Sequence, residues 1–206
     1  MTFSRAWNDV YASGREQIKW PWSDVVSLVT RHCGNIAHKD VLELGCGSGA
    51  NIPFFVSAGA NYHGIEGSHI ACDELKEKYT PFQARLACKD FTEQQPFYSK
   101  FHLIFDRGAV THNDVVAMQS SLDIAYESLL KGGIYIGVDW FSTKHDGAAQ
   151  SYLTGRFEGV GTVTFLDEEQ IRRLFSKFEL IHLEEKVNRS LVGQTAMWNI
   201  VGKKCD

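Results

Sequence analysis

The stretch VLELGCGSGAN (residues 41–51) joins a short apolar run to a loop with glycine at every second position. The apolar run predicts a buried strand, and the residues near 50–58 that follow the loop predict a helix. The glycines at 45, 47 and 49 allow a ligand to approach the backbone, and the amides that open the helix favour an anionic group. The stretch therefore predicts a nucleotide-type cofactor site at a strand-to-helix turn.

Two cofactors fit this loop. The spacing Gly45-x-Gly47-x-Gly49 suits S-adenosylmethionine (SAM). The spacing Gly45-x-Gly47-x-x-Ala50 also satisfies the looser fingerprint of dinucleotide-binding domains. The two interpretations predict different chemistry, so the rest of the chain has to distinguish them.

Strands and helices alternate beyond the loop. Such alternation predicts a parallel sheet covered by helices on both faces. The predicted strands are 40–45, 61–66, 84–89, 101–106 and 134–140. The predicted helices are 22–33, with Ser23 as its N-cap, 50–58, 69–79 and 114–130, the last closed by Lys131-Gly132-Gly133.

The C-terminal part departs from this alternation. Residues 142–163 are polar and rich in glycine, which predicts a long loop, and 167–178 predict an amphipathic helix. The strands predicted at 178–187 and 195–204 are too close in sequence for a parallel crossover, so they pair as an antiparallel hairpin. We therefore expect an α/β fold with a seven-stranded Rossmann-like sheet, in which five parallel strands are followed by a hairpin with one antiparallel strand. A dinucleotide-binding domain has a parallel sixth strand instead.

Acidic residues mark the ends of the predicted strands, where ligands bind in open α/β sheets. Glu43 leads the glycine loop, which also contains Cys46 and Ser48. Glu66, followed by Gly67, comes after the second strand and suits a pair of ribose hydroxyls. Because a glycine loop and an acid at the end of the next strand occur together, the prediction that the loop binds a cofactor is stronger than it is from the glycines alone.

Two further acids follow the third and fourth strands. Asp90 can accept a hydrogen bond from the exocyclic amine of adenine, and the adjacent Phe91 can stack on the ring. Asp106 and Arg107 begin the turn after the fourth strand. We therefore predict that the cofactor contacts Asp90, Phe91, Asp106 and Arg107 in addition to the glycine loop and Glu66.

With these residues in place, the sequence resembles the class I SAM-dependent methyltransferases. The run E-L-G-C-G-S-G (43–49) is similar to the first motif of that family, and FDRGAV (105–110) resembles the corresponding turn of thiopurine methyltransferases and their bacterial relatives. STKHDG (142–147), EQIRRLF (169–175) and LEEKV (183–187) are similar to the tail of that subgroup. Tellurite-resistance methyltransferases share the same architecture.

This resemblance implies a Rossmann-like methyltransferase sheet, SAM as cofactor and S-adenosylhomocysteine as product. It implies a single domain over 1–206, with an N-terminal cap segment over 1–34 and a lid loop over 142–163. In the thiopurine subgroup a tryptophan-bearing N-terminal segment folds over the cofactor. By resemblance, Trp7 or Trp20 covers the methionine moiety, whereas Trp22 lies on the apolar face of a helix and is assigned to core packing.

Three residues are predicted to act on the methyl acceptor. Arg107 matches an arginine that lies near the acceptor in the resembled subgroup, although a structural ion pair with Asp106 or a neighbour is an equal alternative. His112 is a candidate general base because histidine titrates near neutral pH. Asp139, at the end of the fifth strand, can contact the acceptor or assist as a base.

Composition limits the classes of partner. The chain has 206 residues and a net charge of −4, so we expect no nucleic-acid partner. It has no apolar segment of membrane-spanning length, so we expect no membrane partner. Five isolated cysteines predict reduced thiols in a cytoplasm, and the histidine spacing gives no support for a metal site. The chain is little more than a catalytic core, so we expect a small-molecule acceptor.

The acceptor atom stays open at this point. A sulfur, selenium or tellurium nucleophile competes with an oxygen or nitrogen of a metabolite. Two alternatives to a methyltransferase also remain, namely a non-catalytic SAM-binding module and an NAD-dependent oxidoreductase. The second predicts a parallel sixth strand, which the short connection before the last strand disfavours.

Overall fold

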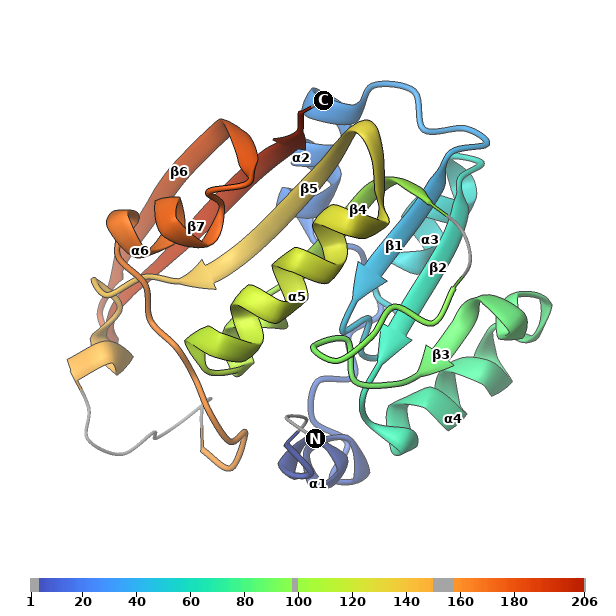
Figure 1. The fold of residues 1–206 in the computed structure, drawn as a ribbon. Coiled ribbons are helices and arrows are strands. Elements are labelled where there is room, and N and C mark those ends of the chain that lie inside the picture. The colour runs from blue at the N-terminus through green and yellow to red at the C-terminus, as the bar shows by residue number, and fades with distance from the viewer. Residues whose placement is uncertain (1–3, 98–99, 150–157, 206) are drawn as a thin grey trace.

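The computed structural model describes residues 4–97, 100–149 and 158–205. Helices lie on both faces of a seven-stranded sheet (Figure 1). The elements, with η for short 3-10 helices, are α1 Ala6–Ala12, α2 Ser23–Cys33, β1 Asp40–Leu44, α3 Ile52–Ser57, β2 Asn61–Glu66, α4 His69–Lys78, η1 Thr80–Arg85, β3 Leu86–Cys88, β4 Phe101–Arg107, η2 Val110–His112, α5 Val115–Ser128, β5 Leu129–Phe141, η3 Asp146–Ala149, α6 Glu168–Leu174, β6 Phe178–Ser190 and β7 Gly193–Lys204.

The strands lie in the order β3-β2-β1-β4-β5-β7-β6. Strands β1 to β5 pair in parallel with their neighbours in this order. Strand β7 runs antiparallel to both β5 and β6. Only Leu191 and Val192 separate β6 from β7, and so short a connection permits only antiparallel pairing. The predicted fold is confirmed, including its C-terminal hairpin.

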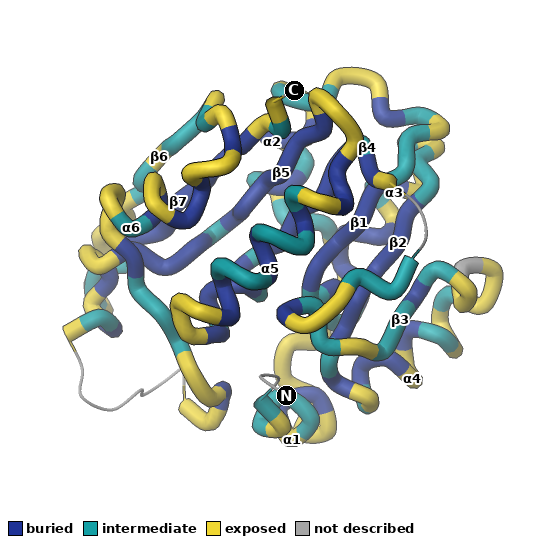
Figure 2. Tube along the Cα trace, in the orientation of Figure 1, coloured by how far each residue is buried: buried dark blue, intermediate teal, exposed yellow. Residues whose placement is uncertain are grey.

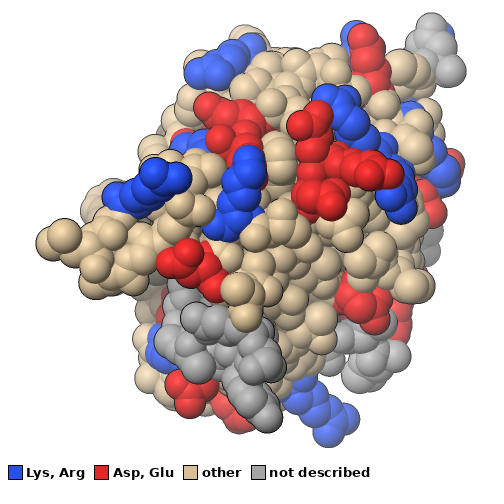
Figure 3. All heavy atoms as spheres, turned by 90° about the vertical axis from the view of Figure 1, so that its left-hand side faces the viewer, with Lys and Arg blue, Asp and Glu red and all other residues tan. Residues whose placement is uncertain are grey.

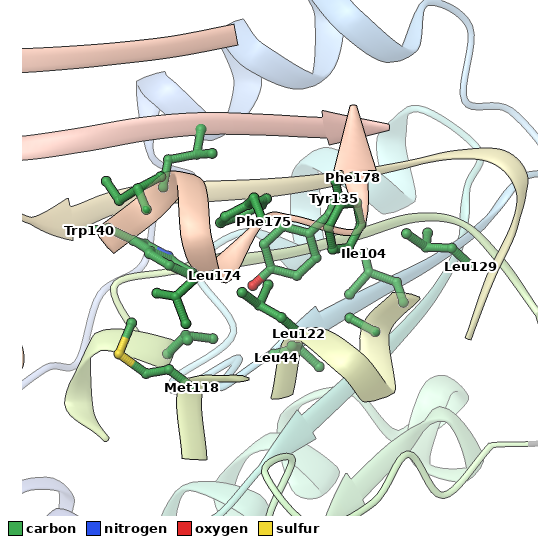
Figure 4. Close-up of a cluster of buried hydrophobic side chains, with 14 of the residues drawn as sticks. Leu44, Ile104, Met118, Leu122, Leu129, Tyr135, Trp140, Leu174, Phe175 and Phe178 are labelled. Carbon is green, nitrogen blue, oxygen red and sulfur yellow. The ribbon is translucent and has the colours of Figure 1, made fainter. Parts of the chain in front are cut away.

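Each face of the sheet carries its own hydrophobic core, because successive strand residues point to opposite faces. In β1, Leu42 packs into the core beneath α5 and α6, whereas Val41 packs into the core beneath α2, α3 and α4. Figure 4 shows the first core, which includes Met118 of α5, Leu174 of α6 and Trp140 of β5. The central strands are buried along most of their length (Figure 2). They are therefore rigid supports for the loops that follow them.

The boundary between α5 and β5 differs from the prediction. Helix α5 ends at Ser128, and Leu129 already pairs with Phe101 of β4. Lys131 and Gly132 therefore lie in the first part of β5 and do not close the helix. The burial of Leu129 between the sheet and α5 favours an extended backbone over one more helical turn.

Two other helix ends also differ from the prediction. Ser23 is the first residue of α2, and Trp22 takes the N-cap position without a side-chain hydrogen bond. Helix α6 ends at Leu174, before the predicted 178, and Asp167 caps its start in a capping box with Gln170. Phe178 instead begins β6 opposite Lys204 and packs into the core.

The predicted loop over 142–163 contains η3 in its described part, while 150–157 lie outside the described residues. An isolated parallel bridge between Ser142 and Leu166 ties its ends together. The side of the molecule in Figure 3 shows basic and acidic side chains interspersed. Within the described ranges, the helices are all too short or too polar to cross a membrane.

Candidate active site

A cavity of about 500 Å³ opens at the carboxyl edge of the parallel strands. Residues at or directly after the carboxyl ends of β1, β2, β3, β4 and β5 line it, and α1 contributes to its wall. Figure 1 shows α1 at this edge, below the tips of β1 and β2. The cavity brings together most of the predicted site residues, namely Glu43, Gly45, Cys46, Gly47, Ser48, Glu66, Gly67, Asp90, Phe91, Arg107, His112 and Asp139.

The glycine loop has a backbone that other residues adopt poorly. Gly45 and Gly47 have φ angles of 66° and 53°. A Cβ atom on Gly45 would lie 2.5 Å from the Cβ of Ala109, and one on Gly47 would lie 2.7 Å from Tyr11 Oη. The loop is therefore packed against both the β4 turn and α1. Gly49, with a φ of 77°, packs away from the cavity against Leu75.

Glu66 lies at the tip of β2 and faces the loop. Its carboxylate accepts hydrogen bonds from the amides of Gly47 and Ser68, each at 2.8 Å. Burial raises the pKa of Glu66, and the backbone donors around it oppose that rise. A carboxylate offers about four acceptor positions, so Glu66 keeps capacity for a hydroxyl in the cavity.

Glu43 is buried in a polar network behind the loop. Tyr62 donates its hydroxyl to Glu43 Oε2, and the Asn51 amide donates to Oε1 at 2.7 Å. Asn51 also accepts from the backbone amide of Trp22 at 3.1 Å, which ties the start of α2 to the loop. Burial raises the pKa of Glu43 to about 8, so this carboxyl holds a proton at neutral pH. Burial also keeps the pKa of the Cys46 thiol well above its usual range, so Cys46 is no nucleophile.

Asp90 and Phe91 form the wall after β3. Thr92 donates both its amide, at 2.9 Å, and its hydroxyl, at 2.6 Å, to Asp90 Oδ1. The Phe91 ring lies 3.6 Å from the Cβ position of Gly45. An oriented carboxylate and an aromatic edge thus lie beside the glycine loop.

Asp106 lies outside the cavity lining. It is fully buried, and its carboxylate accepts from Tyr135 Oη at 2.8 Å, Trp140 Nε1 at 2.9 Å and the amide of Val110 at 3.1 Å. Burial raises its pKa to about 6, against the effect of these donors. Asp106 therefore joins the ends of β4 and β5 and positions the turn that contains Arg107.

Arg107 lines the cavity and contacts Asp139 and Trp22. Its Nε donates to Asp139 Oδ2 at 2.8 Å, and its guanidinium lies 3.5 Å from the centre of the Trp22 ring. The sequence offers an ion pair of Arg107 with Asp106 or a neighbour as one alternative, and in the structure Arg107 pairs with Asp139. Asp139 has a φ of 54°, which is rare outside glycine, and its amide is held by Asn199 Oδ1. Such backbone strain concentrates at functional sites.

His112 lies in an aromatic corner of the cavity. The Trp7 ring is 4.8 Å away and the Phe141 ring 5.4 Å away, both edge-on. Trp20 lies outside the lining and is 79% exposed. His145, in the predicted lid, is buried against Phe141 and does not line the cavity.

Several lining residues are absent from the predicted site, among them Tyr11, Trp22 and Asn51, each of which contacts the glycine loop, Arg107 or Glu43. Tyr11 is one of several N-terminal aromatics in the sequence, with no pattern that singles it out, and Trp22 is predicted to belong to the core. Asn51 has a usable signal, since it is an amide directly after the glycine loop. The N-terminal segment also reaches the loop through Ser48, whose hydroxyl bonds to the backbone of Ile18 at 3.0 Å.

Residues 41–133 match the family described as a methyltransferase domain. The chain has the fold of several solved structures. TehB from Haemophilus influenzae has a TM-score of 0.69 and 16% identity, with 96% of this chain and 67% of that chain covered. A Burkholderia thailandensis 1,6-didemethyltoxoflavin-N1-methyltransferase, solved with 1,6-didemethyltoxoflavin and S-adenosylhomocysteine, has a TM-score of 0.71 and 15% identity, with coverage of 97% and 86%.

A third structure, the N-methyltransferase NodS from Bradyrhizobium japonicum with S-adenosylhomocysteine, has a TM-score of 0.63 and 15% identity, with coverage of 88% and 85%. No curated protein matches the sequence. The chain therefore has the Rossmann-like methyltransferase fold that these structures share.

Proposed function

We propose that this chain is a SAM-dependent methyltransferase that acts on a small-molecule acceptor. The observation that supports this most is the convergence of the strained glycine loop, Glu66 and Asp90 on one cavity in a sheet of the methyltransferase fold. The antiparallel β7 separates the fold from dinucleotide-binding domains, so the loop is assigned to SAM and not to NAD.

The cavity residues fit the parts of SAM. Glu66 would accept from the ribose hydroxyls, Asp90 and Phe91 would hold the adenine, and the amides after Gly45 and Gly47 would meet the methionine moiety. The cavity is within the range of small-molecule sites. When bound, SAM supplies an electrophilic methyl group on a sulfonium.

On the acceptor side, Arg107, Asp139 and His112 have distinct roles. Arg107 is held by Asp139 and by the Trp22 ring, so its remaining donors orient a polar group on the acceptor. His112 or Asp139 removes a proton when the nucleophile still carries one, as an alcohol does. A thiolate, a selenolate or a free amine needs no base. The DRGA turn favours a place for this chain among the thiopurine and tellurite-resistance methyltransferases. The methylated atom of the acceptor is S, Se, Te, O or N.

We also propose one catalytic domain with a cap over 1–34 and a lid over 142–163. The described parts of the two segments meet above the cavity. Val10 of α1 packs with Phe141 and Val160, and a Cβ on Gly161 would lie 2.5 Å from Ser4 Oγ. Cap and lid together exclude water from the site, which a displacement at a sulfonium requires.

The cofactor assignment is tested by calorimetric titration with S-adenosylhomocysteine. Glu66→Ala weakens binding by about 1–3 kcal/mol, because a hydrogen bond from a buried hydroxyl is lost. Glu77→Ala, which removes an exposed acid of α4, is the matched control and leaves the affinity unchanged. Equal affinity in the two variants would remove Glu66 from the ribose site.

The acceptor is tested by a methyl-transfer screen over thiols, selenium and tellurium oxyanions, phenols, amines and sugar nucleotides. Transfer to at least one class supports the enzyme. Binding of S-adenosylhomocysteine without transfer to any class favours the non-catalytic SAM-binding module instead.

A further inference from the structure

Helix α1 lies beside α4 and lines part of the cavity (Figure 1). Asn8 and Tyr11 share one face of α1, because residues three apart on a helix are neighbours on its surface. Tyr11 is buried and Asn8 is half-buried, whereas Asp9 and Ala12 are exposed. Asn8 and Tyr11 therefore lie where α1 meets the body of the domain.

Ser68, at the start of α4, joins Asn8 to Glu66. Its hydroxyl accepts a hydrogen bond from the amide of Ala71 at 3.4 Å and so caps the helix. A serine hydroxyl has one proton, which here goes to Asn8 Oδ1 at 2.8 Å. The Ser68 amide donates to Glu66 Oε1, also at 2.8 Å. One fully buried residue thus binds α1 with its side chain and the carboxylate of Glu66 with its backbone.

Gly47 provides a second donor to Glu66, and α1 contacts this residue as well. The Gly47 amide donates to Glu66 Oε2 at 2.8 Å. A Cβ atom on Gly47 would lie 2.7 Å from Tyr11 Oη, so the Tyr11 hydroxyl packs directly on the glycine. Burial and the charge of Glu66 raise the pKa of Tyr11 well above its usual range, so this hydroxyl stays neutral. Each carboxylate oxygen of Glu66 is therefore held by a residue that touches α1.

The segment after α1 has a contact with α4 that involves neither of these donors. Gln17 Nε2 donates to Glu74 Oε2 at 2.8 Å on the exposed side of α4. This hydrogen bond joins the N-terminal segment to α4, as the bond between Asn8 and Ser68 does, and has the same length. Gln17 and Glu74 do not line the cavity. Gln17 therefore offers a matched control for Asn8.

We propose that Asn8 is a positioning residue that couples the docking of α1 to recognition of the cofactor ribose. It acts through Ser68, whose amide orients the carboxylate of Glu66. This role rests on the proposed function, in which Glu66 accepts from the ribose hydroxyls. Because coupling between two sites is reciprocal, an occupied ribose site also stabilises the docked position of α1 by the same factor.

Calorimetric titration with S-adenosylhomocysteine tests this role. Asn8→Ala leaves the buried Ser68 hydroxyl without its acceptor, and we expect the affinity to fall about fivefold, which corresponds to about 1 kcal/mol. Gln17→Ala also removes a hydrogen bond between the N-terminal segment and α4, and it should bind like the wild type. Equal affinity of the two variants would overturn the proposal.

A double-mutant cycle with Glu66→Ala separates positioning from a general loosening of the structure. If Asn8 acts through the Glu66 carboxylate, Asn8→Ala causes no further loss of affinity once that carboxylate is gone. A merely structural role would give the same loss in both backgrounds, and that result would also overturn the proposal.

Amide hydrogen exchange over residues 6–18 tests the reciprocal effect. Saturating S-adenosylhomocysteine should slow exchange in the wild type and in Gln17→Ala, and should slow it less in Asn8→Ala. Equal slowing in the three proteins would contradict the coupling. A wild type that does not bind S-adenosylhomocysteine at all would instead refute the proposed function, and this role with it.

Discussion

The contact between α1 and the glycine loop gives a sharp prediction at Gly47. Gly47→Ala places a side chain on a backbone with a φ of 53°, which costs about 1–2 kcal/mol. The new Cβ also lies 2.7 Å from Tyr11 Oη, an overlap that costs about 1–3 kcal/mol. The free energy of unfolding should therefore fall by about 2–5 kcal/mol, measured by urea denaturation followed by circular dichroism.

A double-mutant cycle separates the two costs. Tyr11→Phe removes the hydroxyl, after which the nearest atom to the new Cβ is Tyr11 Cζ at 3.8 Å, an ordinary contact. In the Tyr11→Phe background, Gly47→Ala should cost only the backbone part, so the coupling is about 1–3 kcal/mol. Gly14→Ala is the control, because Gly14 has a φ of 77° and open space around its Cβ position. If Gly47→Ala costs no more than Gly14→Ala, or if the cycle shows no coupling, α1 does not pack on the loop as described.

Two further predictions concern stability. Burial raises the pKa of Glu43 from 4.5 to about 8. Folded Glu43 therefore keeps a proton that the unfolded chain has released, so the free energy of unfolding falls as pH rises through this range. Glu43→Gln should reduce this slope of unfolding free energy against pH, measured by denaturation at several pH values. An unchanged slope would mean that Glu43 is ionised in the fold. Asp139→Gly should be about 1 kcal/mol more stable than Asp139→Ala, because both variants lose the ion pair but the positive φ at this position is strained for alanine and not for glycine. Equal stabilities by denaturation would argue against the strain.

Sequence patterns predict the fold well because each buried parallel strand corresponds to a short local run of apolar residues. The predicted strand 61–66 has the same bounds as β2, and it is buried along almost its whole length, as expected for a strand covered on both faces. Because the strand ends follow from the sequence pattern, Glu66 and Asp90 can be placed on one edge of the sheet from the sequence alone. The cavity lining contains both residues.

The remaining features depend on contacts between distant parts of the chain. No local pattern shows that Tyr11 reaches Gly47, that Arg107 pairs with Asp139 and not with Asp106, or that Trp22 lies under the guanidinium. The end of α5 is mispredicted for the same reason, because the pairing of Leu129 in the sheet overrides a helical pattern.

The central claim is that the glycine loop binds SAM. Its most direct test is a pair of calorimetric titrations of the unmodified chain, one with S-adenosylhomocysteine and one with NAD. We predict one-site binding of S-adenosylhomocysteine in the micromolar range and no heat of binding with NAD. Binding of NAD in place of S-adenosylhomocysteine would contradict the claim.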